Sequence, residues 1–386
     1  MSRIETASSW TALAFMLGAT AALVSPPLAA ASFCVGNSTE LNQALNAAQL
    51  NGEDDDIRIR VGDYPTNNPS VQTDGEFTHN MEGGFDLTLS GGWSDFNGIP
   101  CLINLADPDE TTLDGLGANG VLEVRGAADG SGRVTIRNLS IVRAQVDQFS
   151  SGLYLSMPSS EFSGEVLIER VQFSGNQGQQ GSALRVIGGD KVTVRNSVFV
   201  FNRSENGKGV ASIAGGDIRL YFINNTFMYN FHDLPSAGAN DASALYFGFS
   251  LPGTLPQVLV ANNLFWANDT PDLYTSVSGI FHLYNNNLLQ RVGQADFEAG
   301  NLSVDPQLVN APLDFTPALG SPMIDQGYAE PTPPIPFPPS FLSDWSHGTA
   351  DHYNSLVGRI HGEGVDIGAV ESRFLDAVYR DRFESP

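Results

Sequence analysis

The stretch "VLVANNLFWAN" (residues 258–268) places two asparagines between apolar runs, where a buried segment has no obvious use for them. Five similar stretches occur in the chain: "VTIRNLSIVRA" (134–144), "VLIERVQFSGN" (166–176), "VTVRNSVFVFN" (192–202), "LYFINNTFMYN" (220–230) and "FHLYNNNLLQR" (281–291). Their starts are separated by 32, 26, 28, 38 and 23 residues. Internal similarity at such a period predicts a solenoid built from stacked coils.

Each unit has the same internal pattern. The first and third residues are apolar, which is typical of a strand with one buried face. The fifth residue is asparagine in five of six units, the eighth is large and apolar, and the eleventh is asparagine in four. The fifth positions are Asn138, Arg170, Asn196, Asn224, Asn262 and Asn285. An apolar pair, a bend and another apolar residue describe a chain that turns a corner around its core.

Asparagine suits such a corner because it tolerates the left-handed backbone conformation and can bond nearby backbone groups. Coils that stack at the strand spacing of about 4.8 Å would also let equivalent amides bond one another along the axis. We therefore interpret these asparagines as structural.

A second strand lies between the units, as in "SGLYLSM" (151–157) and "GSALRVIG" (181–188). Its predicted inward pairs are Leu122/Val124, Leu153/Leu155, Leu184/Val186, Ala211/Ile213 and Leu245/Phe247. The chain is therefore predicted to be all-β, a right-handed parallel β-helix. A β-propeller is the alternative, but its blades are longer and antiparallel.

The ends of the solenoid need different structures. Residues 37–52 predict a short capping helix, with Ser38 as N-cap candidate and a stripe of Leu41, Ala44, Leu45 and Ala48. The predicted order is a signal peptide (1–31), the β-helix with its N-terminal cap (32–310), a Pro-rich segment that wraps the last coil (311–372) and a flexible tail (373–386).

The beginning of the chain predicts export. An apolar run at residues 10–24, too short to span a bilayer, precedes "SPPLAAAS", so we expect cleavage near Ala30 or Ala31. No second hydrophobic stretch of spanning length follows. In an exported chain Cys34 and Cys101 can form a disulfide, the alternative being two buried thiols.

The net charge is strongly negative, and the loss of residues 1–31 would leave it at -24. This charge argues against non-specific binding of nucleic acid or anionic lipid. The same charge would repel a polyuronate ligand, unless local basic residues or bound calcium offset the repulsion.

The chain resembles exported bacterial β-helix proteins of the pectate-lyase-like superfold, particularly those with a "choice-of-anchor Q" C-terminal region. The matching pieces are "GSPMIDQG" (320–327), "DIGAVE" (366–371), "GGFDLTLSGGW" (83–93) and the asparagine repeats. The ending "VYRDRFE" resembles a terminal signature of exported proteins in some Gram-negative bacteria, with Arg382 in place of its glycine. The resemblance implies secretion or retention at the cell envelope. The superfold hosts lyases, hydrolases and adhesins, so it implies no single activity.

The sequence contains no recognisable catalytic motif. The paired aspartates and Gly-His of polygalacturonases, the "WxDH" strand of pectate lyases, Ser-His-Asp elbows, phosphate loops and zinc spacings are all missing. The longest coil bulges at "FHDLPSAGAND" (231–241), next to shorter loops on the same corner. Candidate catalytic residues there are His232, Asp233 and Asp241, and candidate ligand-binding residues are Arg203, Asp269, Asp272 and Tyr274. A solvated loop edge is the plainer alternative.

Two further sets of polar residues have structural and functional interpretations. Outward residues of the second strand run Glu123, Tyr154, Arg185, Ser212 and Tyr246, and the first strand offers Arg137, Glu169 and Arg195. Cross-strand pairing explains the alternation of charge, but Tyr154, Arg185 and Tyr246 could also stack against sugar rings. Near the end, an ion-pair network is predicted among Asp325, Asp344, Arg359, Asp366 and Glu371. Ca²⁺ is the alternative there and at residues 54–56 and 107–114.

Taken together, the sequence predicts an exported, acidic β-helix that binds a polysaccharide or cell-surface glycan along the flank of the solenoid, without a cofactor. The first alternative is a polysaccharide lyase or glycosidase with a non-standard site at the loops. The second is a structural adhesin shaft without affinity for glycans.

Overall fold

The computed structural model describes most of the chain. The described residues are 30–66, 77–81, 83–126, 131–146, 152–156, 164–233, 240–248, 255–269, 271–276, 279–328, 346–353, 358–360 and 364–372. The predicted signal peptide up to residue 29, the predicted tail and parts of the Pro-rich segment lie outside them. No helix among the described residues is long and apolar enough to cross a membrane.

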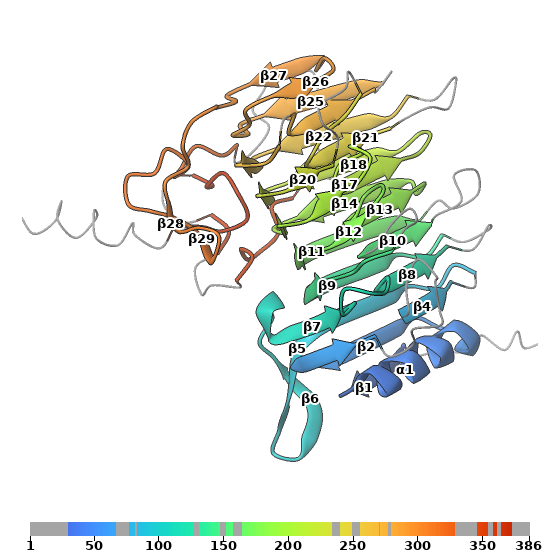
Figure 1. Cartoon of the computed structure of the whole chain (residues 1–386). Helices are drawn as coiled ribbons and strands as arrows, with labels where there is room; N and C mark the ends of the chain where they lie inside the picture. Colours follow the sequence, from blue (N-terminus) through green and yellow to red (C-terminus); the bar gives the residue numbers. More distant parts are fainter. Residues whose placement is uncertain are drawn as a thin grey trace, which may run out of the picture.

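Two long parallel sheets form the walls of the solenoid (Figure 1). The first sheet has the path β1 (Ala31–Val35), β2 (Asp55–Arg60), β5 (Leu87–Phe96), β9 (Val134–Val142), β11 (Glu165–Ser174), β14 (Lys191–Arg195), β18 (Arg219–Ile223), β22 (Gln257–Ala261), β25 (Ile280–Tyr284) and β27 (Phe297–Ala299). The second sheet runs through β4 (Phe77–Asn80), β8 (Leu122–Arg125), β10 (Leu153–Ser156), β13 (Leu184–Ile187), β17 (Ala211–Ala214), β21 (Leu245–Phe247), β24 (Leu273–Thr275) and β26 (Arg291–Val292).

Shorter strands complete the coils. Past the corner of the first sheet lie β15 (Val198–Val200), β19 (Thr226–Met228) and β23 (Leu264–Trp266), and nearer the N-terminus β3 (Gly62–Pro65) and β7 (Thr111–Asp114). A three-stranded corner sheet consists of β12 (Gln177–Gly178), β16 (Arg203–Ser204) and β20 (Phe231–His232). A 3₁₀ turn (Pro108–Glu110) and an antiparallel pair, β28 (Leu308–Asn310) with β29 (Asp314–Pro317), complete the described elements.

The strand register confirms the prediction of a parallel β-helix. Val166 lies between Val134 and Val192 in neighbouring strands, as the repeat alignment requires. In the second sheet Leu153 lies between Leu122 and Leu184. The predicted inward residues of both strands are buried. At the eighth position Phe173, Phe199, Phe227 and Phe265 form a continuous ring stack, with neighbouring centroids 4.7, 4.4 and 5.0 Å apart.

The fifth positions adopt the predicted left-handed conformation in all six units. Their φ angles lie between 50° and 58°, and Arg170, the exception in residue type, has a φ of 52°. Most L-residues avoid this region, and asparagine is one of the few that adopt it readily. The corner thus explains the preference for asparagine at this position.

Amide ladders form at the sixth and eleventh positions. At the eleventh position Nδ2 of Asn176 donates to Oδ1 of Asn202 (2.9 Å), and the contact repeats through Asn230 to Asn268 (3.1 and 3.0 Å). A second ladder joins Asn225, Asn263, Asn286 and Asn301. These amides therefore satisfy one another inside the stack.

Fifth-position amides of the later coils instead bind the C-terminal segment, which lies along the flank. Nδ2 of Asn196 donates to the carbonyl of His347 (2.7 Å), and Nδ2 of Asn262 donates to that of Tyr328 (3.0 Å). Phe315, Ala369 and Val370 form an apolar cluster with Val198 and Met228 of β15 and β19. The described residues of this segment contact the last repeat coil, where Nδ2 of Asn285 donates to the carbonyl of Gln326 (2.7 Å), and they also fill an apolar stripe that earlier coils share.

The N-terminal helix α1 (Ser38–Asn51) covers the first coils through the predicted stripe, whose four residues are buried. Its N-cap is Asn37, not Ser38. The Asn37 side chain accepts from the amide of Glu40, whereas the Ser38 hydroxyl donates to the carbonyl of Pro65. β6 (Ile99–Asn104) pairs antiparallel with β5, and the Cys34–Cys101 disulfide joins this hairpin to β1.

The eleventh-position ladder makes a testable contribution to stability. Asn202 makes four bonds with its side chain, to the Phe173 carbonyl, the Asn230 side chain, and the amide and side chain of Asn176. Asn202→Ala leaves these buried groups unsatisfied, so we expect the free energy of unfolding to fall by about 4 kcal/mol. Urea denaturation followed by circular dichroism measures the change. The exposed Asn310→Ala is the control, and equal losses in the two variants would contradict the expectation.

Candidate functional site

The described candidate catalytic residues at the corner do not form a cluster of three. Asp233 is exposed and pairs with Arg203, whereas the Asp241 carboxylate lies 3.8 Å from Nζ of Lys208. The backbone amide of His232 donates to Asp269 (3.1 Å). His232, Asp233 and Asp241 are not among the described residues whose ligand atoms lie within 4.8 Å of one another. Within this part of the chain the corner thus presents ion pairs rather than a gathered acid and base.

Asp272 is a structural residue, and we remove it from the ligand-binding candidates. Its side chain is 2% exposed and accepts from Nδ2 of Asn268 (3.1 Å) and the amides of Leu289 and Gln290 (2.8 and 3.3 Å). Burial raises the pKa of this carboxyl. It ends the eleventh-position ladder, because it accepts from Asn268, the last asparagine of that row.

The outward residues of the second sheet lie in the expected row. Tyr154 is in register with Glu123 and Arg185, and Ser212 with Arg185 and Tyr246. Tyr274, predicted at the corner, continues this row instead, because it is in register with Tyr246. Its hydroxyl donates to Oδ1 of Asn240 (3.1 Å).

The ring faces of Tyr246 are already occupied. Tyr274 stacks on one face, with centroids 4.7 Å apart, and Lys208 Nζ lies 4.9 Å from the ring centroid. Arg185 donates to Oε1 of Gln180 (2.7 Å). A sugar could therefore meet Tyr246 only at its edge, which weakens the prediction that these residues stack against a glycan.

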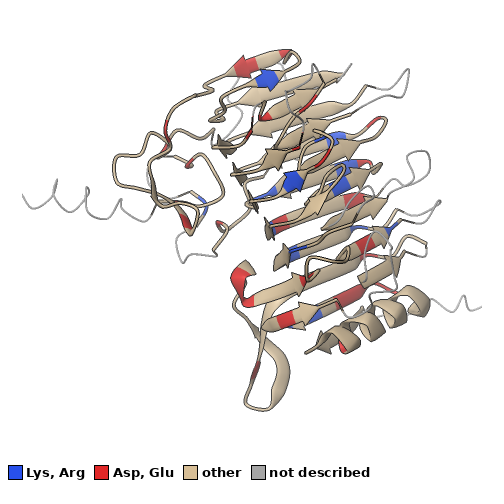
Figure 2. Ribbon diagram, in the orientation of Figure 1, with Lys and Arg blue, Asp and Glu red and all other residues tan. Residues whose placement is uncertain are grey.

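The outer face of the first sheet carries a groove that sequence reasoning did not identify. It has a volume of about 400 Å³ and extends over β5, β9, β11 and β14. Its floor is a row of residues in register, Thr88, Thr135, Leu167 and Thr193. Cations flank the floor, with Arg133 and Lys191 on one side and Arg137 and Arg195 on the other. In Figure 2 several of the blue segments lie on the central strands of the solenoid.

Three of these cations are paired and one is not. Glu165 lies 3.0 Å from Arg133 and 3.7 Å from Lys191, and Glu169 lies 2.8 Å from Arg195. Within the described part of the chain Arg137 has no hydrogen-bond or ion-pair partner, and its Nε is buried. The sequence did place Arg137 and Arg195 on the outer face, but their alternation with Glu169 suggested simple cross-strand pairing.

The same face is closed beyond β14. The next residues of the floor row are Tyr221, Leu259 and His282, and all three are buried, Tyr221 and His282 completely. His282 stacks on Phe297, with centroids 4.8 Å apart, and its Nδ1 lies 3.3 Å from the hydroxyl of Tyr284. The groove thus occupies four strands and ends at a covered aromatic cluster.

The C-terminal carboxylates form a buried network, as the ion-pair interpretation expected. Nε of Arg359 lies 3.2 Å from Glu371, and both side chains are buried. With the Asn224 amide turned so that its oxygen faces Arg359, that oxygen accepts from Nε and Nη2 (2.6 and 3.0 Å). Burial raises the pKa of Glu371 to about 8. The network fastens the C-terminal segment to a fifth-position asparagine.

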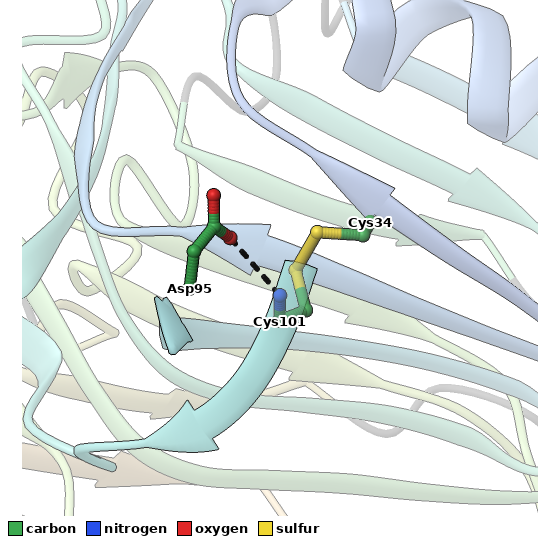
Figure 3. Close-up of side chains that lie close together, drawn as sticks. All are labelled: Cys34, Asp95 and Cys101. Carbon is green, nitrogen blue, oxygen red and sulfur yellow. Dashed lines mark hydrogen bonds between the residues drawn. A yellow bond between two sulfur atoms is a disulfide. The ribbon is translucent and has the colours of Figure 1, made fainter. Parts of the chain in front are cut away.

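A metal site has little support among the described residues. Their one cluster of potential ligands is Cys34, Asp95 and Cys101 (Figure 3). Its two sulfurs form the disulfide, and Oδ1 of Asp95 accepts from the Cys101 amide (3.1 Å). Of the calcium candidates, Asp56 pairs with Arg58, Asp114 pairs with Arg143, and Asp54 accepts from the amide of Asp86.

Comparisons with known proteins add little to this geometry. No family model matches the chain, and no curated protein matches it. Among solved structures the chain is similar to the crystal structure of pectate lyase Pel9A, with a TM-score of 0.33 and 12% identity over 85% of this chain and 90% of that chain. Because this similarity is low, the fold described here rests on the strand register.

The buried His282 predicts a pH dependence of stability. Burial lowers its pKa to about 4 in the folded chain, whereas an unfolded histidine has a pKa of about 6.5. As the pH falls from about 6.5 to 4, the unfolded chain takes up a proton that the folded chain does not, so stability is lost. In His282→Gln we expect this loss to be smaller by about 2 kcal/mol. Urea midpoints at several pH values measure the difference, and parallel curves for the two proteins would contradict it.

Proposed function

We propose that this protein is an exported glycan-binding β-helix and that the groove over β5, β9, β11 and β14 binds an acidic polysaccharide. The observation that carries the proposal is Arg137, a groove-lining guanidinium with a buried Nε and no partner among the described residues. A buried guanidinium nitrogen without a hydrogen-bond acceptor is costly, and an anionic ligand would supply one.

The shape of the groove favours a linear polymer. Its floor residues repeat at the strand spacing of about 4.8 Å, close to the length of one sugar unit in an extended chain. Threonine hydroxyls in the floor can donate and accept hydrogen bonds. Cations on both sides can bind carboxylate or sulfate groups, and arginine can do so with two parallel bonds. The repeat of the coils would then match the repeat of the ligand.

The groove carries four cations, three of them paired with Glu165 or Glu169, in a chain whose net charge is -24. The acidic remainder of the surface would repel a polyanion from other faces, so binding would be confined to this groove. Local basic residues in the groove would allow a polyuronate to bind in spite of the negative net charge of the protein.

The leader-like segment at residues 10–24 supports a location outside the cytoplasm, either secreted or in the cell envelope of a Gram-negative bacterium. The Cys34–Cys101 disulfide is consistent with an oxidising compartment. The enzymatic alternative is less favoured, because in the described part of the chain Asp233 pairs with Arg203 and the backbone amide of His232 donates to Asp269.

Affinity electrophoresis of the purified mature chain tests the proposal. We expect retardation in gels that contain alginate or dextran sulfate, and none with neutral dextran. Arg137→Gln removes a charge-assisted contact worth about 1.5–3 kcal/mol, so affinity should fall at least about tenfold. Arg203→Gln, which removes the same charge at the corner, is the matched control and should bind like the parent protein.

Two results would contradict the proposal. Equal retardation by neutral dextran would show that charge is not recognised, and a loss of binding in Arg203→Gln alone would move the site to the corner. The appearance of unsaturated uronides or new reducing ends, lost in Asp233→Asn, would establish the enzymatic alternative.

A further inference from the structure

The two ends of the groove differ. Toward the N-terminus the floor row continues through Asp56 of β2 to Ser32 of β1. Asp56 is partly exposed and Ser32 is exposed, so this end is open along the solenoid. An extended ligand could leave the groove here without meeting a covered surface.

Toward the C-terminus the floor is covered within one strand. Thr193 of β14 lines the groove, whereas Tyr221, its register partner in β18, is 0% exposed. Ser346 of the C-terminal segment also lines the groove, and its carbonyl accepts from Nη1 of Arg195 (3.2 Å). The chain itself therefore closes the groove between these two strands.

Cations are placed on both sides of the closed end. Lys191 and Arg195 lie in β14, the last strand of the groove, and Nζ of Lys191 lies 6.0 Å from the centroid of the Tyr221 ring. Arg137 lies two strands away in β9. A glycan chain whose end lies at the closed end of the groove, next to the buried Tyr221, would have one anionic sugar unit between Lys191 and Arg195. A later unit of the same glycan would lie beside Arg137.

From this asymmetry we infer that the groove recognises the end of an acidic glycan chain and not its interior. The inference rests on the proposed function. The four strands span three intervals of about 4.8 Å, which accommodates about three or four sugar units. The terminal unit lies at β14, and the rest of the polymer leaves past β5. An internal segment would have to continue through the covered face, so only a chain end can enter.

The number of proteins bound per chain tests this inference. Mannuronate oligomers from about four to about sixteen units, long enough to exceed the groove severalfold, are titrated with the purified mature chain in a calorimeter. One protein per oligomer is expected at every length, with an affinity that stops rising at about four units. A number that grows in proportion to length would overturn end recognition while leaving acidic-glycan binding intact. No heat and no retardation with any acidic oligomer would instead overturn the proposed function, and the inference with it.

A modification of the oligomer ends provides a second readout. A bulky fluorophore on the end that enters the groove should reduce affinity at least about tenfold, the size of a lost charge-assisted contact. The same fluorophore on the other end should have no effect. Equal tolerance at both ends would overturn the inference. Lys191→Gln should weaken the binding of oligomers of all lengths by the same factor, and Arg203→Gln should leave it unchanged.

Discussion

The fold depends on equivalent residues of successive coils lying directly opposite one another in parallel strands. Because the register does not slip between β9 and β25, each position of the repeat becomes a continuous row along the axis. One row is a phenylalanine stack, two are asparagine ladders and one is the groove floor. A single geometric constraint thus builds both the core and the candidate binding surface.

Sequence periodicity predicted those features that repeat. Three features follow from the pattern: the inward pairs, the left-handed corners and the outward row of the second sheet that contains Tyr154. Every coil supplies one member of each, so an exception in one coil does not obscure the prediction. The groove did not follow, because its distinguishing property is that Arg137 lacks a partner among the described residues, and pairing depends on side chains from several coils. Asp272 was misassigned for a related reason, since the backbone amides that donate to it, those of Leu289 and Gln290, have no fixed spacing in the sequence.

The fifth-position asparagines show how one residue type can carry two functions. The backbone of Asn196 and Asn262 turns the corner, and their side chains bind the C-terminal segment. The buried pair Arg359–Glu371 adds a contact that would be costly to break on one side only. Together these contacts explain why a Pro-rich segment with little secondary structure has a defined path over several coils, and why its residue Ser346 can border the groove.

The C-terminal segment also restricts how this protein can change in evolution. Four coils, which begin at residues 192, 220, 258 and 281, bind this segment through their fifth-position side chains, those of Asn196, Asn224, Asn262 and Asn285. The insertion of a coil among them would move these asparagines away from their partners in the segment. In the coil that begins at residue 134 the fifth-position amide bonds within the stack, where Asn138 accepts from Nε of Arg170 (2.8 Å). Duplication of this coil would lengthen the groove by one strand spacing and leave the anchored region unchanged. The number of coils before the anchored region therefore sets the length of the groove, and selection can change this number.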